Sequence, residues 1–218
     1  TAGIIGPWAL YNGGELASYD DTLGVIPAPD SAFADIAAKG PSSSVPDAAG
    51  VNARINEEGD DGPITLAGAV TTSVNTLSQN TEWDSEVAMT NQTLLTSGVL
   101  INPGKAALTL GTAANQGVLA PLSSGGNLLL ANNGVSSLTI NADISDNASA
   151  STLTKAGSGA VRLNGLIGHT GGTSLGEGEL ILGGSATQTL AGVISGTGTL
   201  VKDGDGRIIL GTANTYTG

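Results

Sequence analysis

His169 is the one histidine in the chain, and histidine is the side chain best suited to proton transfer near neutral pH. A catalytic triad or a metal site would require partner residues around it, and the neighbouring sequence supplies none. His169 occupies the position that Tyr216 holds in a second, similar segment. We therefore expect it to be a stacking or surface ring, and not a catalytic or metal-binding residue.

Adjacent carboxylates are the second group that could support chemistry. Three such pairs occur, at Asp20–Asp21, Glu57–Glu58 and Asp60–Asp61. Hydrolysis of a glycosidic bond requires two carboxyl groups that face each other across a cleft, whereas neighbouring residues of a strand point to opposite faces. We predict no catalytic residues and expect that the protein is not an enzyme. A polysaccharide-degrading β-helix enzyme is the less favoured alternative. The sugar rings of its substrate would stack on Trp8, Tyr11, Tyr19, Trp83 or Tyr216.

Two acidic, glycine-containing segments resemble calcium-binding loops in composition. They are Glu57-Glu58-Gly59-Asp60-Asp61-Gly62 and Asp203-Gly204-Asp205-Gly206. Calcium takes about six to eight oxygen ligands. The first segment lacks the ligand spacing of an EF-hand, and the second aligns with a segment that has no acids. Gly204-x-Gly206 is not a nucleotide-binding loop, because no helix follows it. We interpret both segments as glycine turns with solvated acids and predict neither a metal site nor a cofactor.

The charge and composition of the chain exclude several classes of partner. The 218 residues carry a net charge of −12, with 13 Asp and Glu against 2 Lys and Arg in residues 1–100, and 6 against 5 in residues 101–218. An acidic surface disfavours nucleic acids and anionic membranes, and no apolar run approaches the ~20 residues of a membrane helix. We therefore predict no nucleic-acid partner and no membrane insertion. The absence of cysteine excludes disulfide bonds.

Short runs that alternate apolar and polar residues dominate the sequence, and nearly all of them are followed within two residues by glycine or asparagine. In Val161-Arg162-Leu163 a charged residue separates two apolar ones, and Thr199–Lys202 and Ile208–Leu210 flank a glycine turn. A period of two is typical of a strand with one buried face, and glycine permits sharp turns between strands. With 34 glycines and only 3% aromatic residues, the core must consist of thin layers of small side chains. The predicted class is all-β.

Two similar segments, residues 152–171 and 199–218, align without gaps at an offset of 47 residues. Leu153 aligns with Leu200 and Lys155 with Lys202, and both lysines precede a Gly-x-Gly turn. A fixed offset indicates stacked units, whereas a β-sandwich, the alternative, would show matched hairpins and no long-range offset. We predict a right-handed parallel β-helix in which this offset corresponds to about two coils. The abundant threonine and asparagine residues are suited to hydrogen-bonded ladders between coils.

A single β-helix segment is expected to span residues 1–218. Residues 1–27 contain the initial strands, and residues 64–218 form the stacked coils. Residues 28–63 break the pattern with prolines and serines, and they are predicted to be a loop. Within this loop, residues 31–39 are predicted to form a short helix, with a serine at its start and a glycine directly after its end.

The C-terminal run 192–218 resembles the autotransporter-associated β-strand repeat, which occurs in the passenger regions of very large bacterial surface proteins. The segment 152–171 is similar but departs at its end, where Ile167 and His169 replace the Asn and Tyr. The opening residues 4–9, followed by 24–26, are similar to a non-repetitive segment that recurs between repeat blocks. The residues that carry the repeat pattern are Ile194, Leu200, Lys202, Gly204, Gly206, Leu210, Asn214, Tyr216, Thr217 and Gly218.

The resemblance implies a secreted or cell-surface β-helix that acts as a stalk, adhesin or matrix component, and no catalytic residues are associated with the repeat. We therefore expect an extracellular or bacterial cell-surface location and a structural or adhesive role as a stalk or fibre segment. A host-cell surface, a matrix surface or a polysaccharide would be the adhesive partner. The alternative is a self-assembling extracellular filament, in which terminal coils stack between chains. Both Thr1 and Gly218 are expected to lie within a longer polypeptide.

Overall fold

A computed structural model of the chain describes residues 4–6, 9–11, 15–40 and 42–218. In these residues the only helical element is one turn of 3-10 helix, η1 (Asp30–Ala32), and the rest of the regular structure is β. The first three strands form a small antiparallel sheet, which we call the meander; it consists of β1 (Leu10–Tyr11), β2 (Glu15–Asp20) and β3 (Gly24–Pro27).

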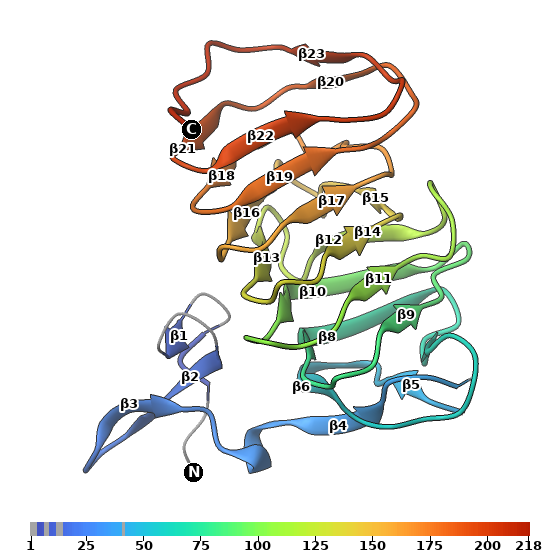
Figure 1. Cartoon of the computed structure of the whole chain (residues 1–218), viewed down its shortest axis with the longest axis vertical. Helices are drawn as coiled ribbons and strands as arrows, with labels where there is room; N and C mark the ends of the chain where they lie inside the picture. The colour runs from blue at the N-terminus through green and yellow to red at the C-terminus, as the bar shows by residue number, and fades with distance from the viewer. Residues whose placement is uncertain (1–3, 7–8, 12–14, 41) are drawn as a thin grey trace.

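The strands that follow wind into a parallel β-helix (Figure 1). The main path of the first sheet has eight strands in parallel register: β4 (Ala34–Ala37), β6 (Ala48–Glu57), β8 (Thr71–Gln79), β10 (Thr93–Ile101), β13 (Asn127–Asn132), β16 (Thr152–Ala156), β18 (Thr173–Leu175) and β21 (Ile194–Gly196). The second sheet has six: β9 (Ser85–Val87), β11 (Leu108–Leu110), β14 (Leu138–Ile140), β17 (Val161–Leu163), β19 (Glu179–Leu182) and β22 (Thr199–Lys202).

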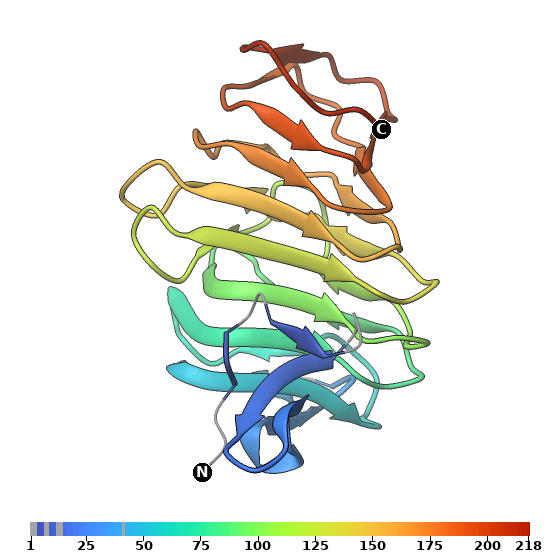
Figure 2. The ribbon, with the colours of Figure 1, turned by 90° about the vertical axis from the view of Figure 1, so that its left-hand side faces the viewer.

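Six further strands complete the coils. They are β5 (Ser44–Val45), β7 (Thr65–Leu66), β12 (Val118–Pro121), β15 (Asp143–Ile144), β20 (Gln188–Leu190) and β23 (Ile208–Leu210), and each pairs in parallel. Two of them, β12 and β15, branch from the first sheet at β10, and the other four form two separate pairs. As the chain climbs, the second sheet runs left to right across the front of Figure 1, and the first sheet runs left to right in the rotated view of Figure 2. This is the sense of a right-handed coil. The predicted right-handed parallel β-helix is confirmed.

The core of the β-helix is one stack of apolar side chains that runs through the coils. In β9, β11, β14 and β17 the first and third residues are buried and the middle residue is half-buried, as the period of two predicts. The stack extends from Ala38 in the lowest coil to Ile194, and half-buried residues of the last coil pack against its upper end. Because each layer is covered only by its neighbours, the coils stabilise one another.

The offset of 47 residues does not equal two coils, so that part of the prediction is wrong. Leu153 lies in the first sheet, where it pairs with Thr173 one coil above, and Thr173 pairs with Ile194 in the next coil. Leu200 lies in the second sheet and pairs with Leu180. Two coils therefore take 41 residues here, and the offset adds the step to the next sheet. The repeated unit is a corner of the coil, and the same corner motif is used at two different corners.

The predicted helix at residues 31–39 is wrong. After the single turn of η1, Ala34–Ala37 form the strand β4, which pairs in parallel with β6. An isolated helix of nine residues is marginal in water, and here the edge of β6 offers the backbone of β4 a continuous set of hydrogen-bond partners. Tertiary pairing thus overrides the local preference of an alanine-rich segment.

The boundaries predicted for residues 1–63 also require correction. Residues 28–63 are not a loop, because they contain β4, β5 and the ten-residue strand β6, so the coils begin at Ala34 and not at residue 64. Strands do occur within residues 1–27, but they are antiparallel and do not belong to a coil. The meander instead lies against the outer face of the first sheet (Figure 2). There Leu16 packs in a small apolar cluster with Leu100 and Leu129.

Polar ladders run between coils along the outside of the rod. Asn102 donates to Asn80 (2.8 Å) and Asn80 donates to Asn56 (2.7 Å), and on another side Asn164 donates to Asn141 (2.8 Å). The predicted asparagine ladders are therefore present. Across the described part of the chain, no helix has the length and apolar character that crossing a lipid bilayer would need.

Candidate functional site

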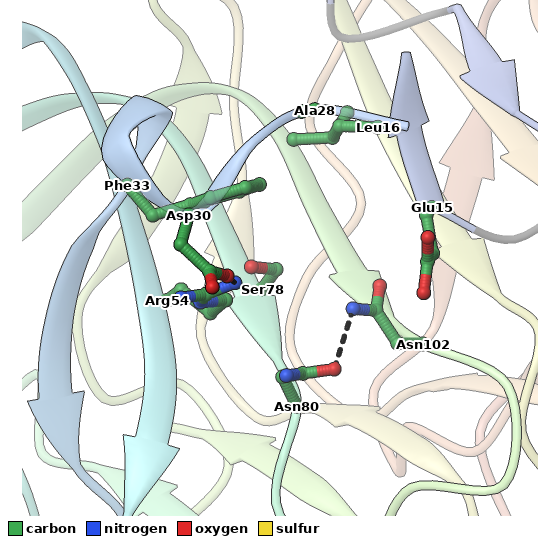
Figure 3. A pocket seen from close by; sticks show the side chains of 9 residues that line it. All are labelled: Glu15, Leu16, Ala28, Asp30, Phe33, Arg54, Ser78, Asn80 and Asn102. Carbon is green, nitrogen blue, oxygen red and sulfur yellow. Dashed lines mark hydrogen bonds and ion pairs between the residues drawn. The ribbon is translucent and has the colours of Figure 1, made fainter. Parts of the chain in front are cut away.

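A polar pocket lies where the meander meets the outer face of the first sheet (Figure 3). Its volume is about 190 Å³. One wall comes from β2 and from the segment that leads into β4, and the other comes from side chains of β6, β8 and the turns that follow β8 and β10. The residues that line it are Glu15, Leu16, Ala28, Asp30, Phe33, Arg54, Ser78, Asn80 and Asn102.

Arg54 is the fixed cation of this pocket. Its Nε and one terminal nitrogen donate to the two carboxylate oxygens of Asp35 (2.6 and 2.9 Å), and the other terminal nitrogen donates to Asp30 (2.8 Å). The guanidinium also lies 4.5 Å from the centre of the Phe33 ring. Hydrogen bonds from Arg54 hold the pKa of Asp35 below its usual range, and the pKa of Arg54 is raised by the same pairing. Both groups therefore stay charged, and the side chain of Arg54 is held rigidly in a position where only 7% of the residue is exposed.

The asparagine ladder forms the opposite part of the lining. Asn102 is its last described member, and its Nδ2 donates to Asn80, so its Oδ1 is turned away from the ladder. The carboxylate of Glu15 lies on the same side of the pocket (Figure 3). Within the described residues neither this carboxylate nor Asn102 Oδ1 accepts a hydrogen bond, which leaves two free acceptor groups on one side of the pocket.

His169 has a different environment from the one predicted. It is not a surface ring: only 6% of the residue is exposed, and Nε2 lies 2.9 Å from Thr173 Oγ1. Burial lowers its pKa, although the nearby charge of Asp146 opposes that shift. Nδ1 has no hydrogen-bond partner in the described part of the chain. His169 and Tyr216 also do not lie one above the other in the stack. The offset of 47 residues places them on different sides of the coil.

The predicted carboxylate pairs and acidic loops do not converge on a common site. Asp20 accepts hydrogen bonds from the backbone of Leu23 and Thr22 in the turn between β2 and β3, and these bonds lower its pKa. Residues 57–62 are mostly exposed at the lowest coils. Asp203 binds Arg162 (2.7 Å) and its pKa is lowered by that contact. In the residues described here, no three histidine, cysteine or carboxylate side chains are close enough to hold a metal ion.

The aromatic residues that could stack on sugar rings are dispersed. Trp8 lies outside the described residues, Tyr19 and Trp83 are exposed on separate elements, and Tyr216 packs on the upper end of the core. Among described residues, none of these rings lines the pocket. Sequence reasoning missed the residues that do, because Phe33 falls within the helix predicted for residues 31–39 and the asparagines of the ladder are 22 residues or more apart.

The lysine of each repeat segment folds over its own Gly-x-Gly turn. Nζ of Lys155 donates to the backbone carbonyls of the next two residues and to that of Glu177 in the coil above (2.6 Å). Nζ of Lys202 donates to the two equivalent carbonyls of its turn (2.9 and 2.7 Å). Lys155 is 1% exposed, whereas Lys202 lies in the last described coil and is exposed. Lys155 therefore joins its own turn to the coil above, whereas Lys202 binds only its own turn.

The upper end of the rod leaves part of the apolar core accessible. Ile209 and Leu210 of β23 are 38% and 40% exposed. A hollow of about 250 Å³ opens there, lined by Leu182, Leu200, Lys202, Ile208, Leu210 and Tyr216.

No family model, no curated protein and no solved structure matches this chain.

Proposed function

We propose that this protein is a non-enzymatic stalk segment of an exported bacterial surface protein, which holds adhesive surfaces at a fixed distance. The observation that carries the proposal is the single core that runs without interruption from Ala38 to Ile194. A continuous core with parallel pairing on every rung makes a stiff rod, because no boundary exists at which the coils can bend independently. The repeat pattern at residues 192–218 supports export and a surface location, since it resembles that of passenger regions.

The absence of a built catalytic arrangement in the described residues supports the non-enzymatic part of the proposal. At the pocket, Asp30 and Asp35 are both paired with Arg54, which leaves Glu15 as a single unpaired carboxylate among the described residues there, and one carboxylate does not make the pair that glycoside hydrolysis requires. An adhesive target on a host cell, in the matrix or on a polysaccharide would be contacted by the sides of the rod, where loops and polar ladders are exposed.

Small-angle X-ray scattering tests the stalk directly. The scattering curve should fit one elongated particle whose shape does not change between low and high salt, because the rod is held by apolar burial and backbone pairing. A compact or bending particle would contradict the proposal. Proteolysis of intact producing cells tests the location: the protein should be cleaved from outside, and full protection would reject surface exposure.

Self-assembly into a filament is the second candidate, because stacked parallel coils allow coil-on-coil association between copies. The edge of β22, the half-exposed Leu210 and the uncovered Lys202 form the surface that a further coil would complete, whereas residues 214–217 already cover β21. We propose that the lowest coil of a second copy is the occupant. Residues 1–100 carry most of the acidic charge, so two lower ends would repel each other, whereas the exposed charges of the upper end, Lys202, Asp203, Asp205 and Arg207, balance. Negative-stain images should then show fibres with an axial repeat. Separate short rods at high protein concentration would reject this candidate.

A further inference from the structure

We propose that the pocket between the meander and the first sheet binds one unit of a neutral or amino sugar. This inference deepens the adhesive part of the proposed function by naming a ligand class and a site. The structure of the rod does not depend on the pocket, so the stalk proposal and the sugar-binding proposal can be rejected independently.

The hydrogen-bonding groups of the pocket suit a polyhydroxyl ligand. Glu15 and Asn102 Oδ1 are acceptors without a partner among the described residues, and the second N–H of the Asn102 amide remains a donor. A sugar hydroxyl donates one hydrogen bond and accepts others, so one ring can satisfy both kinds of group at once. Unlike a surface cluster of like charges, this lining offers donors and acceptors side by side.

The apolar part of the lining and the size of the pocket narrow the ligand further. Leu16, Ala28 and Phe33 line the part of the pocket opposite the asparagine ladder and expose a small apolar area there. A sugar ring matches a pocket with one apolar and one polar side, because it has C–H groups on one face and hydroxyl groups around its rim. The volume of about 190 Å³ is below the ~300 Å³ at which sites for drug-sized ligands begin, so it accommodates one ring and not a buried oligosaccharide.

The charged groups around the pocket distinguish among neutral, amino and acidic sugars. The groups in and directly behind the pocket are Glu15, Asp30 and Asp35 against the single cation Arg54. The guanidinium is already held by two carboxylates, so it is not available to bind an anion. A uronic or sialic acid would place a further carboxylate beside Glu15 and is disfavoured, whereas a neutral hexose is tolerated and an amino sugar is attracted.

The pocket also has the rigidity that a weak ligand needs. The wall formed by β6, β8 and their turns is fixed before binding, because Arg54 is locked by three hydrogen bonds and Asn80 is held on both sides by the ladder. Little conformational entropy is therefore lost when a ring enters. Its place on the flank of the rod leaves the site open to the terminal sugar of a glycan on an opposing surface.

Ligand-observed NMR and calorimetry on the purified chain, with a panel of hexoses, hexosamines and hexuronates, test the proposal. Hexoses or hexosamines should bind in the millimolar range, about −4 kcal/mol, and hexuronates at least about tenfold more weakly. Binding by hexuronates equal to that by the other sugars, or no binding by any hexose or hexosamine, would overturn it.

Variants locate the site. Asn102→Ala should weaken binding about tenfold by removing a hydrogen-bonded amide. Asn164→Ala is the matched control, because it removes the same kind of ladder bond (2.8 Å) away from the pocket, and it should leave affinity unchanged. Glu15→Lys, at an exposed position that tolerates substitution, should abolish hexosamine binding even if Asn102→Ala does not fold. Equal loss in the Asn164 variant, or unchanged binding in the Glu15 variant, would reject the site. Unchanged scattering by the Glu15 variant would show that the rod persists without it.

Discussion

Lys155 shows how a single charged residue can be buried in a narrow β-helix. Its amine is surrounded by three backbone carbonyls, two from its own turn and one from the coil above. Burial lowers its pKa to about 8, and the nearby carboxylates of Glu177 and Glu179 oppose that shift. The residue thus satisfies carbonyl oxygens that would otherwise be buried without a donor, and this explains why a lysine, and not an apolar residue, precedes the Gly-x-Gly turn.

Removing the two repeat lysines should have unequal effects. Lys155→Met leaves buried carbonyls without their donor and should lower the free energy of unfolding by about 1–3 kcal/mol. Lys202→Met is the matched change at an exposed position and should alter it by less than about 0.5 kcal/mol. Urea denaturation of both variants measures the difference, and equal effects would contradict the clamp role of Lys155.

The pH dependence of the same variants provides a second readout. Unfolded Lys155 keeps its proton up to its ordinary pKa of 10.5, whereas the folded residue begins to lose it near pH 8. The folded state therefore binds fewer protons in this window, and the contribution of Lys155 to stability should increase as the pH rises from about 8 to 10.5. The gap between the wild type and Lys155→Met should widen over that range and stay constant below it.

At the scale of the element, the corner between two strands restricts the choice of residues more strongly than the strands do. Gly157 has a φ of +77°, and a Cβ at this position would overlap the carbonyl oxygen of Asn132 in the coil below. Gly204 occupies the same place in the second segment with a φ of +87°, and it approaches the backbone of Gly183 in the same way. The Gly-x-Gly turn is therefore needed both for its backbone conformation and for close packing of successive coils.

Alanine substitutions separate these two requirements. Gly104→Ala meets only the left-handed backbone cost of about 1–2 kcal/mol, because at its φ of +72° no other group lies within 4 Å of the point that the new Cβ would occupy. Gly157→Ala meets that cost and the overlap, and it should destabilise by clearly more, about 3 kcal/mol or above. Gly50→Ala, with free space and no positive φ, should be close to neutral. Thermal melting ranks the three, and a Gly157 variant no worse than the Gly104 variant would show that the coils can separate at this corner.

At the scale of the whole molecule, the rod has two different ends. Its lower half carries 13 of the acidic residues, while the upper half is nearly balanced in charge. Two lower ends repel each other, whereas the nearly neutral upper end repels a lower end much less. This polarity gives the head-to-tail direction that a filament would require.

The assembly prediction can be tested at this scale with one substitution at the upper end. Leu210→Lys places a charge in the hollow that an incoming coil would fill and should abolish fibres, whereas Val135→Lys on a lateral turn, where the valine is 99% exposed, should leave them intact. Sedimentation velocity measures both effects, and equal behaviour of the two variants would place the contact elsewhere.

The sequence by itself determined the class of fold. Period-two alternation and glycine corners are local features, and each strand such as Val161–Leu163 buries the residues that its own pattern predicts. The asparagine ladders were predictable in kind for the same reason. The corner motif with Lys155 and Lys202 was also visible, since its hydrogen bonds to its own turn span only two residues.

Only the tertiary structure decided where the coils begin, what the repeat offset means and which residues form a pocket. Residues 34–37 became a strand because β6 supplied an edge, and no local pattern records that edge. The offset of 47 residues crosses from one sheet to the next, because the same corner serves any side of the coil. Glu15, Arg54 and Asn102 meet because the meander folds back on the first sheet, and contacts between distant segments depend on how layers stack and not on spacing along the chain.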